Sequence, residues 1–356
     1  MILYRSVEAV FMWPFVLCWS LIFVSSAAIT RGMISLGIVD RLTKRSLHTK
    51  PTPRAGGIAI VSTYLFSILT LYNLNSELFD TRSSSQLYAI LGTTTAIVAI
   101  SFYDDIRSIS YLYRLFFQLV CAIAIVQSGI GLNRIWLPYV GYIRLSNFEA
   151  LLNVLWIVSF INIFNFMDGV DGMVSGCSIL GCAFLSLIAN NNGDRLTLYS
   201  LMVMIPATAG FFIFNFPKAK IFMGDVGSHF QGLLFALHEI NISARASDDL
   251  IPGLTTVVIV GNFVFDVAFT LIRRLASGKS IVKPHNEFLF HILYKSGWSH
   301  VKISLLHFGF VVFQGTLVCF SSSKTALALS ALAVLTVQSI YAYSVLHMRS
   351  KIAAGD

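Results

Sequence analysis

Charged residues are scarce in this chain of 356 residues, at 12% of the sequence against roughly 25% in an ordinary soluble domain. Together with a hydrophobic content of 56%, this scarcity excludes a water-soluble globular protein. Apolar runs of about 20 residues, the length that crosses a membrane as helix, recur along the whole chain and leave no room for a separate soluble domain. The sequence therefore predicts a single integral membrane domain over residues 1–356.

Paired cysteines and continuous basic stripes are also absent from the sequence. The five cysteines stand singly inside apolar runs, without metal-ligand spacing or paired loop positions, so a disulfide framework and a zinc site are excluded. The net charge of +8 comes from basic residues in short loops between the apolar runs. A nucleic-acid partner is therefore not expected, because such a partner requires a contiguous basic surface.

The apolar runs predict an all-α polytopic membrane protein with about ten or eleven transmembrane helices. The run at 230–240 is too short to cross a hydrocarbon core of about 30 Å without its flanks, which leaves ten as the alternative. The first run is longer than a signal-peptide core and is interpreted as a membrane anchor. The predicted helices cover residues 8–30, 55–74, 86–102, 113–130, 148–165, 174–190, 197–215, 230–240, 250–272, 301–320 and 324–346.

Lysine and arginine are distributed unequally between the two sides of this predicted domain. With eleven alternating helices, one side carries 18 of these residues, Arg54, Arg107 and Arg114 among them, and the other side carries 7. The positive-inside rule places the richer side in the cytoplasm. The segments whose residue types suggest chemistry, 40–57, 103–107, 162–172, 215–228 and 283–291, then all fall on that side, whereas the opposite loops carry only scattered polar residues. This arrangement predicts an active site at the cytoplasmic face.

Acidic residues gather in two of these segments. Asp104 and Asp105 are adjacent at the end of the third apolar run, where they indicate a shared divalent cation or a held proton, with a solvated helix end as the alternative. The next cytoplasmic segment contains Asn165 and two Asp-Gly steps, at Asp168 and Asp171. A turn explains the glycines, but the recurrence of Asp without a basic partner favours metal or ligand binding.

A third segment combines Gly224, Asp225 and Ser228 just before an apolar run. Backbone amides in a Gly-rich turn can face an anion, and Asp225 can bind a cation that bridges to that anion. A nucleoside diphosphate with Mg²⁺ satisfies both requirements, while an ordinary capped loop is the alternative. Because Mg²⁺ usually takes only one or two carboxylates, one of the remaining acids is free for acid–base chemistry.

Basic residues and glycines occur together in residues 40–57, which include His48, Lys50 and Arg54. Cations beside a Gly pair suit phosphate, although the topology alone also predicts basic loops here. His285 and a second histidine six residues later flank a Phe-rich stretch. Each is interpreted either as a phosphate contact or as an interfacial polar side chain.

Two other function classes compete with an enzyme. A transporter is the main alternative, because acids near membrane helices also mark ion pathways. The acids here lie at one face, however, and the sequence shows no internal repeat. A non-catalytic lipid-binding protein is the second alternative. Asp266, inside the run 250–272, is equally well explained by a structural pairing and is left outside the site.

Three motifs in this order make the chain resemble the polyprenyl-phosphate N-acetylhexosamine-1-phosphate transferase family. They are Asp104-Asp105, NIFNFMDGVDG at 162–172 and NFPKAKIFMGDVGS at 215–228. Residues 45–57 are most similar to the branch that begins O-antigen or related surface-glycan synthesis. The resemblance implies transfer of a sugar 1-phosphate from a UDP-N-acetyl sugar to undecaprenyl phosphate, with release of UMP, in the bacterial inner membrane among its lipids.

The resemblance also implies roles for single residues. Asp225 is similar to the Mg²⁺ ligand on the pyrophosphate, with Mn²⁺ as the alternative cation, and Asp104 to the acid that activates the lipid phosphate beside Asp105. Asp104 and Asp168 are further candidate metal ligands. Phe222 is similar to an aromatic residue that stacks on uracil. The candidate substrate-binding residues are His48, Lys50, Arg54, Asn165, Asp168, Asp171, Asn215, Lys220, Phe222, Gly224, Ser228 and His285.

One motif departs from the family pattern. Members of this branch carry His-Arg-x-His, whereas this chain reads His285-Asn286-Glu287-Phe288, and His291 is the nearest substitute for the second histidine. The donor sugar is left open among UDP-GlcNAc, UDP-GalNAc, UDP-FucNAc and UDP-QuiNAc. The sequence predicts no particular oligomeric state.

Overall fold

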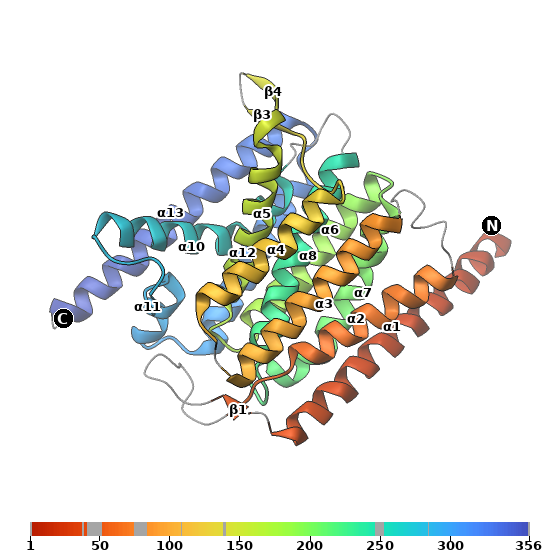
Figure 1. Ribbon diagram of the computed structural model, residues 1–356, viewed down its shortest axis with the longest axis horizontal. Coiled ribbons are helices and arrows are strands. Elements are labelled where there is room, and N and C mark those ends of the chain that lie inside the picture. Colours follow the sequence, from red (N-terminus) through yellow and green to blue (C-terminus); the bar gives the residue numbers. More distant parts are fainter. Residues whose placement is uncertain are drawn as a thin grey trace.

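The computed structural model describes residues 2–37, 39–40, 52–74, 84–107, 109–137, 140–245, 253–283 and 285–354. These residues form a helical bundle with two small two-stranded sheets (Figure 1). The helices are α1 (Ile2–Leu36), α2 (Gly57–Leu74), α3 (Ser84–Arg107), α4 (Tyr111–Gln127), α5 (Glu149–Met167), α6 (Met173–Asn191), α7 (Arg195–Asn215), α8 (Gly224–Arg245), α9 (Thr255–Ile259), α10 (Gly261–Ala276), α11 (Leu289–Lys295), α12 (His300–Cys319) and α13 (Lys324–Ala354). The strands are β1 (Val39–Asp40), β2 (Thr52–Pro53), β3 (Arg134–Leu137) and β4 (Gly141–Arg144).

Within the described residues, eight helices are long and apolar enough to cross a membrane. They are α1, α2, α3, α5, α6, α7, α12 and α13, and α4 is a shorter apolar helix of 17 residues. This result confirms the prediction of an all-α polytopic membrane protein. Helix α8 also runs through the bundle, and the weak run at 230–240 lies at its centre, extended on both sides to 22 residues.

The prediction of one continuous helix over 250–272 is wrong. Helix α9 ends at Ile259, the backbone at Val260 leaves the helical region (φ −104°, ψ 28°), and α10 begins at Gly261. In Figure 1, α10 runs across the bundle rather than along it. A Cβ at position 261 would lie 2.8 Å from Val334 Cγ1, so the helix start packs closely against α13. An apolar run cannot reveal such a break, because both halves are equally apolar.

Helix α8 is the central element of the bundle and packs against α2, α3 and α5. Its Phe235 ring lies 4.8 Å from that of Phe164 in α5, which in turn lies 5.5 Å from Phe263 in α10. All three side chains are fully buried. This packing fixes the direction of α8 and therefore the position of its first turn.

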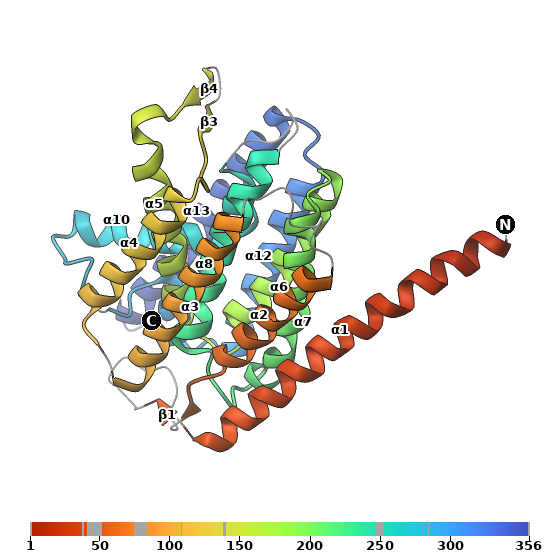
Figure 2. The same cartoon turned by 45° about the vertical axis from the view of Figure 1, so that its right-hand side comes forward.

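The two small sheets lie at opposite ends of the bundle, as both cartoon views show (Figures 1 and 2). The β1–β2 pair lies at the end where α3 finishes and α8 begins, and the β3–β4 hairpin lies at the other end. The polar motifs of the sequence gather at the first end.

Glu239 is a fully buried acid near the end of α8. Its carboxylate accepts hydrogen bonds from the backbone amides of Gly253 (2.9 Å) and Thr256 (2.6 Å) and from the hydroxyl of Ser243 (2.9 Å). It thereby satisfies amides at the start of α9 that no carbonyl within that helix can reach. Its role in the structure is to hold α9 against α8.

Glu239→Ala is expected to lower the free energy of unfolding by about 2 kcal/mol or more, because it leaves buried donors without an acceptor. Glu239→Gln keeps one acceptor oxygen and should lose about half as much. Unfolding of the detergent-purified protein by titration with sodium dodecyl sulfate, followed by circular dichroism, measures both. An alanine variant as stable as the parent protein would contradict the assigned role.

Candidate active site

The segment that precedes α2 is bound to the segment that precedes α8. The Phe222 amide donates to the Pro53 carbonyl (2.7 Å), and the amides of Gly56 and Gly57 donate to the carbonyls of Phe222 (3.0 Å) and Met223 (2.8 Å). Arg54 and Phe222 form a parallel bridge. These backbone bonds place the Arg54 side chain beside the first turn of α8.

The starts of α2 and α8 touch each other at two glycines. A Cβ at Gly57 would lie 2.2 Å from the Gly227 nitrogen and 2.6 Å from its Cα. No side chain fits at that distance, so only glycine permits the contact. The Gly pair in the basic segment, which sequence reasoning assigned to phosphate, therefore has a packing role as well.

Asp105 holds the first turn of α8. Its carboxylate accepts the amides of Asp225 (3.1 Å) and Val226 (3.4 Å) and forms an ion pair with Arg54 Nε (2.9 Å). Gly224 has a φ of +71°, and a Cβ there would lie 2.6 Å from Asp105 Oδ2. A carboxylate at a helix N-terminus is favoured by the unpaired amides and by the helix dipole.

Asp225 is the centre of the site. Its carboxylate accepts hydrogen bonds from Arg54 Nη2 (2.8 Å), Arg114 Nη1 (2.7 Å) and Asn165 Nδ2 (3.1 Å). Arg114 also pairs with Asp104 (3.0 Å), whose other oxygen accepts the Ile109 amide (2.6 Å). We call Asp104, Asp105 and Asp225, together with Arg54 and Arg114, the carboxylate cluster.

The guanidinium groups cover the carboxylates of this cluster. The side chains of Arg54 and Arg114 are 28% and 30% exposed, whereas those of the three acids are 0–8% exposed. Two guanidinium groups thus stand above three more deeply buried acids. An incoming phosphate would meet the two guanidiniums first, and a cation would be drawn to the carboxylates beneath them.

Asp168 lies beside the cluster in the loop after α5, and its side chain makes no hydrogen bond or ion pair with the described residues. Burial raises the pKa of Asp168 to about 7, and the nearby charges of Asp225 and Asp171 add to that rise while Arg54 opposes it. A partnerless carboxylate near Asp225 is a suitable donor for a hard cation.

The described residues contain no group of three His, Cys, Asp or Glu side chains arranged to hold a metal ion. A cation that relied on protein ligands alone therefore does not fit. Mg²⁺ fits, because it keeps several waters and usually takes one or two carboxylates plus substrate phosphate oxygens. Asp168, Asp225 and Asp104 are the available donors.

Two predicted substrate-binding residues are used to connect loops. Asn215 accepts the Gly172 amide (2.9 Å) and donates to the Ile221 carbonyl (2.9 Å). Asp171 accepts the Ala219 amide (3.0 Å) and lies 3.0 Å from His300 Nδ1. These bonds join the loop after α5 to the loop before α8.

The other candidates are placed less centrally. Ser228 accepts a hydrogen bond from Asn165 (3.1 Å), Lys220 is exposed, and Phe222 is half-buried. His285 lies in the loop after α10, where its ring packs on Phe288, and burial lowers the pKa of His285. His48 and Lys50 lie outside the described residues. The assigned roles of all these residues stay predictions.

His291 approaches the Asp168 loop from α11. A Cβ on Gly169 would lie 3.8 Å from His291 Nε2, and the imidazole stacks on Phe290 at 4.0 Å. Burial lowers the pKa of His291 to about 3, so the ring is neutral at physiological pH, and its Nδ1 has no partner among the described residues. His291, which follows the altered motif, therefore lies close to the Asp168 loop.

A second polar layer lies one helical turn beneath the cluster, on the same four helices. His229 Nδ1 in α8 is 2.8 Å from Ser101 Oγ in α3, and His229 Nε2 is 3.5 Å from Gln118 in α4. Asn162 in α5 donates to Gln118 (2.7 Å). The sequence analysis did not predict this layer, and it interpreted Arg114 only as a topological residue. His229 lies four residues after Asp225, Gln118 four after Arg114, and Asn162 three before Asn165. Such spacing places each pair on the same face of its helix and could have indicated the layer.

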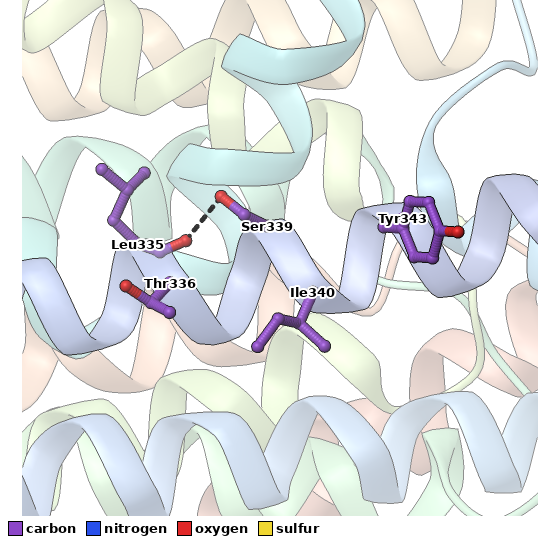
Figure 3. A pocket seen from close by; sticks show the side chains of 5 residues that line it. All are labelled: Leu335, Thr336, Ser339, Ile340 and Tyr343. Carbon is purple, nitrogen blue, oxygen red and sulfur yellow. Dashed lines mark hydrogen bonds between the residues drawn. The ribbon is translucent and has the colours of Figure 1, made fainter.

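A groove of about 450 Å³ on α13 carries no comparable chemistry. Figure 3 shows its lining of Leu335, Thr336, Ser339, Ile340 and Tyr343, with the Ser339 hydroxyl bonded to the Leu335 carbonyl of its own helix (2.8 Å). It contains no acid or base, so the carboxylate cluster is the better candidate site.

Comparison with known proteins gives consistent results. A model of the family described as "Glycosyl transferase family 4" matches residues 87–243, which run from α3 to α8. The chain is 30% identical over 280 residues to a "Probable undecaprenyl-phosphate N-acetylglucosaminyl 1-phosphate transferase" of Bacillus subtilis, covering 78% of this chain and 76% of that protein.

Two further relatives are similar over most of their length. A "Decaprenyl-phosphate N-acetylglucosaminephosphotransferase" of Mycolicibacterium smegmatis is 29% identical, covering 85% of this chain and 81% of its own. A "Phospho-N-acetylmuramoyl-pentapeptide-transferase" of Lacticaseibacillus paracasei is 27% identical, covering 76% of this chain and 84% of its own.

The affinity of the site for Mg²⁺ is expected to rise with pH. Below the pKa of about 7, Asp168 is protonated and a cation must displace the proton. Affinity should therefore increase up to tenfold per pH unit between about pH 5.5 and 7 and level off above about pH 8. Isothermal titration calorimetry of Mg²⁺ into the detergent-purified protein measures this, with Asp168→Asn as the variant in which the slope is reduced. Equal slopes in both proteins would remove Asp168 from the metal site.

Proposed function

The chain belongs to the polyprenyl-phosphate N-acetylhexosamine-1-phosphate transferase family, and from this premise we propose that it transfers an N-acetylhexosamine 1-phosphate from a UDP-sugar to undecaprenyl phosphate. It is a phosphosugar transferase of a multi-pass membrane type.

The carboxylate cluster is the observation that carries the proposal. Phosphoryl transfer between two anionic substrates requires cationic groups that neutralise the phosphates and a defined geometry that holds them in line. Arg54 and Arg114 supply two guanidiniums at the exposed side of Asp225. They come from different segments, so two phosphates can be bound from two directions.

The reaction forms one phosphorus–oxygen bond and breaks another. An oxygen of the lipid phosphate attacks the β-phosphorus of the UDP-sugar, and the bridging bond to the α-phosphate breaks, so that UMP leaves with the electron pair. Asp104, at the end of α3, is suited to hold the lipid phosphate in its reactive ionised form, and Arg114 joins Asp104 to Asp225. Asp105 accepts backbone amides at the start of α8 and thereby positions Asp225; it is a positioning residue.

Mg²⁺, held by Asp225 and Asp168 with Asp104 as a further donor, would neutralise the diphosphate and the leaving UMP. Mn²⁺ is the alternative cation. The roles of the protein groups follow from this arrangement: Arg54 and Arg114 exchange carboxylate for phosphate partners, and Asn165 orients Asp225. His291 is placed to contact a phosphate or sugar hydroxyl near the Asp168 loop.

We place the site at the cytoplasmic face of the bacterial inner membrane, from the distribution of lysine and arginine. The resemblance of residues 45–57 to the O-antigen branch supports a role in the first membrane step of surface-glycan synthesis. N-acetylglucosamine occurs in the names of the Bacillus and Mycolicibacterium relatives, which makes UDP-GlcNAc the first donor to test.

A transporter is less well supported by the positions of the acids. Transporters place ionisable groups near the bilayer midplane along a pathway. Here the cluster lies at one end of the bundle, and the buried acids Glu239 and Asp266 hold backbone amides at helix starts.

Purified protein in detergent with undecaprenyl phosphate and Mg²⁺ should release UMP from one of the four candidate UDP-sugars, and release should require the lipid. Asp225→Asn and Asp104→Asn should each lower the rate by about 10³-fold, because charge stabilisation at the reacting phosphates is lost. An unchanged thermal unfolding midpoint shows that each variant is folded. Full activity of a folded Asp225→Asn protein would remove that residue from its role.

Arg114→Gln should lower the rate of UMP release by about 10²-fold, because one guanidinium is removed from the cluster. Arg107→Gln is the matched control: Arg107 is an exposed arginine at the end of α3 and should retain the parent rate within about twofold. Equal rates for the two variants would return Arg114 to a topological role.

A further inference from the structure

A polar cavity of about 460 Å³ lies at the base of the β3–β4 hairpin. The hairpin lies at the end of the bundle opposite the β1–β2 pair (Figure 1). Neither the motifs nor the proposed reaction uses the cavity. Its lining includes Arg134, Arg144, Ser146, Glu149 and Ser243. These side chains come from the hairpin, the start of α5 and the end of α8.

The base of the hairpin is held by buried hydrogen bonds. Asn153 in α5 is 1% exposed, and its side chain accepts the Leu132 amide (2.7 Å) and donates to the Leu132 carbonyl (2.9 Å). The Leu145 amide donates to the Asn133 carbonyl (3.0 Å). The cavity therefore has a fixed wall.

Two arginines face each other across the hairpin. Arg134 and Arg144 are directly paired in the β3–β4 register, so their side chains lie on the same face. Like charges in such a pair repel each other. Arg134 lies over the Tyr142 ring (4.4 Å), as does Lys324 (4.4 Å), and neither arginine forms an ion pair with a described residue. Among the described residues, the positive charge of these two arginines is therefore not neutralised by an ion pair.

Glu149 adds one negative charge at the other side of the cavity. Its carboxylate forms no ion pair or hydrogen bond with the described residues, so it is also available to a ligand. The cavity therefore offers two cationic groups and one anionic group at separate places. Ser146, beside them, is the one described residue other than glycine with a positive φ (42°), a conformation that is more common at functional sites than elsewhere.

The position of the cavity along the membrane normal indicates the source of a ligand. Helix α5 has 19 residues from Glu149 to Met167, a length of about 28 Å at 1.5 Å per residue, close to a hydrocarbon core of about 30 Å. When the carboxylate cluster lies at one membrane interface, Glu149 lies at the headgroup level of the other leaflet.

We propose that this cavity binds the headgroup of a zwitterionic phospholipid of the phosphoethanolamine type. The phosphate lies between Arg134 and Arg144, and the ammonium group faces Glu149. A purely anionic headgroup satisfies the arginines but is repelled by the glutamate. This binding site is separate from the transfer reaction and does not depend on it.

Native mass spectrometry of the full chain in detergent tests the proposal, with phosphatidylethanolamine and phosphatidylglycerol of identical acyl chains supplied in equal amounts. The parent protein should retain one phosphatidylethanolamine at least about threefold in preference to phosphatidylglycerol. The double variant Arg134→Gln/Arg144→Gln should retain at least about tenfold less phosphatidylethanolamine than the parent protein. Glu149→Gln should reverse the preference toward phosphatidylglycerol, because only the ammonium partner is removed.

Arg195→Gln is the matched control, since Arg195 is an exposed arginine at the start of α7 outside the cavity, and its lipid binding should equal that of the parent protein. The thermal unfolding midpoint of each variant identifies those that are misfolded, and Glu149→Gln tests the proposal without altering the hairpin. Equal binding of the two lipids by the parent, or an unchanged preference in Glu149→Gln, would overturn the proposal. Full displacement of the lipid by millimolar inorganic phosphate would show a site for free anions instead.

Discussion

The bonds made by Asp225 are the constraint on which the rest of the site depends. Its carboxylate binds Arg54 from the segment before α2, Arg114 from α4 and Asn165 from α5, so three distant parts of the chain meet at the first turn of α8. That turn is itself held by Asp105 and by glycine contact with α2. The packing of α8 at the centre of the bundle therefore decides where the reactive groups lie.

Five acids of the described residues illustrate two roles that the sequence does not distinguish. Asp105, Glu239 and Asp266 each accept two backbone amides at the start of another helix: α8, α9 and α11, respectively. Such acids are costly in a membrane domain unless these bonds satisfy them. Asp225 instead faces guanidinium groups, and Asp168 has no described partner, which leaves both available to a substrate phosphate or a cation. The position of an acid in a motif therefore does not by itself establish a catalytic role.

The length and apolarity of the runs were sufficient to predict the all-α membrane fold, because backbone in a bilayer must satisfy its own hydrogen bonds. They could not predict the break at Val260, since apolar content does not change there. Motif spacing identified Asp104, Asn165 and Asp225, which the structure brings together. It missed Arg114 and His229, whose places depend on how α4 and α8 rotate against each other, and it could not separate the loop-connecting role of Asn215 from substrate contact. The roles of these residues in catalysis are still predictions.

A structure of the protein with UDP and Mg²⁺ would show where the diphosphate binds relative to the carboxylate cluster. We expect diphosphate oxygens within hydrogen-bonding distance of Arg54 or Arg114, a cation on Asp225, and at least one guanidinium released from its carboxylate partner. A diphosphate bound elsewhere, with both guanidiniums still paired to Asp225, would contradict this expectation.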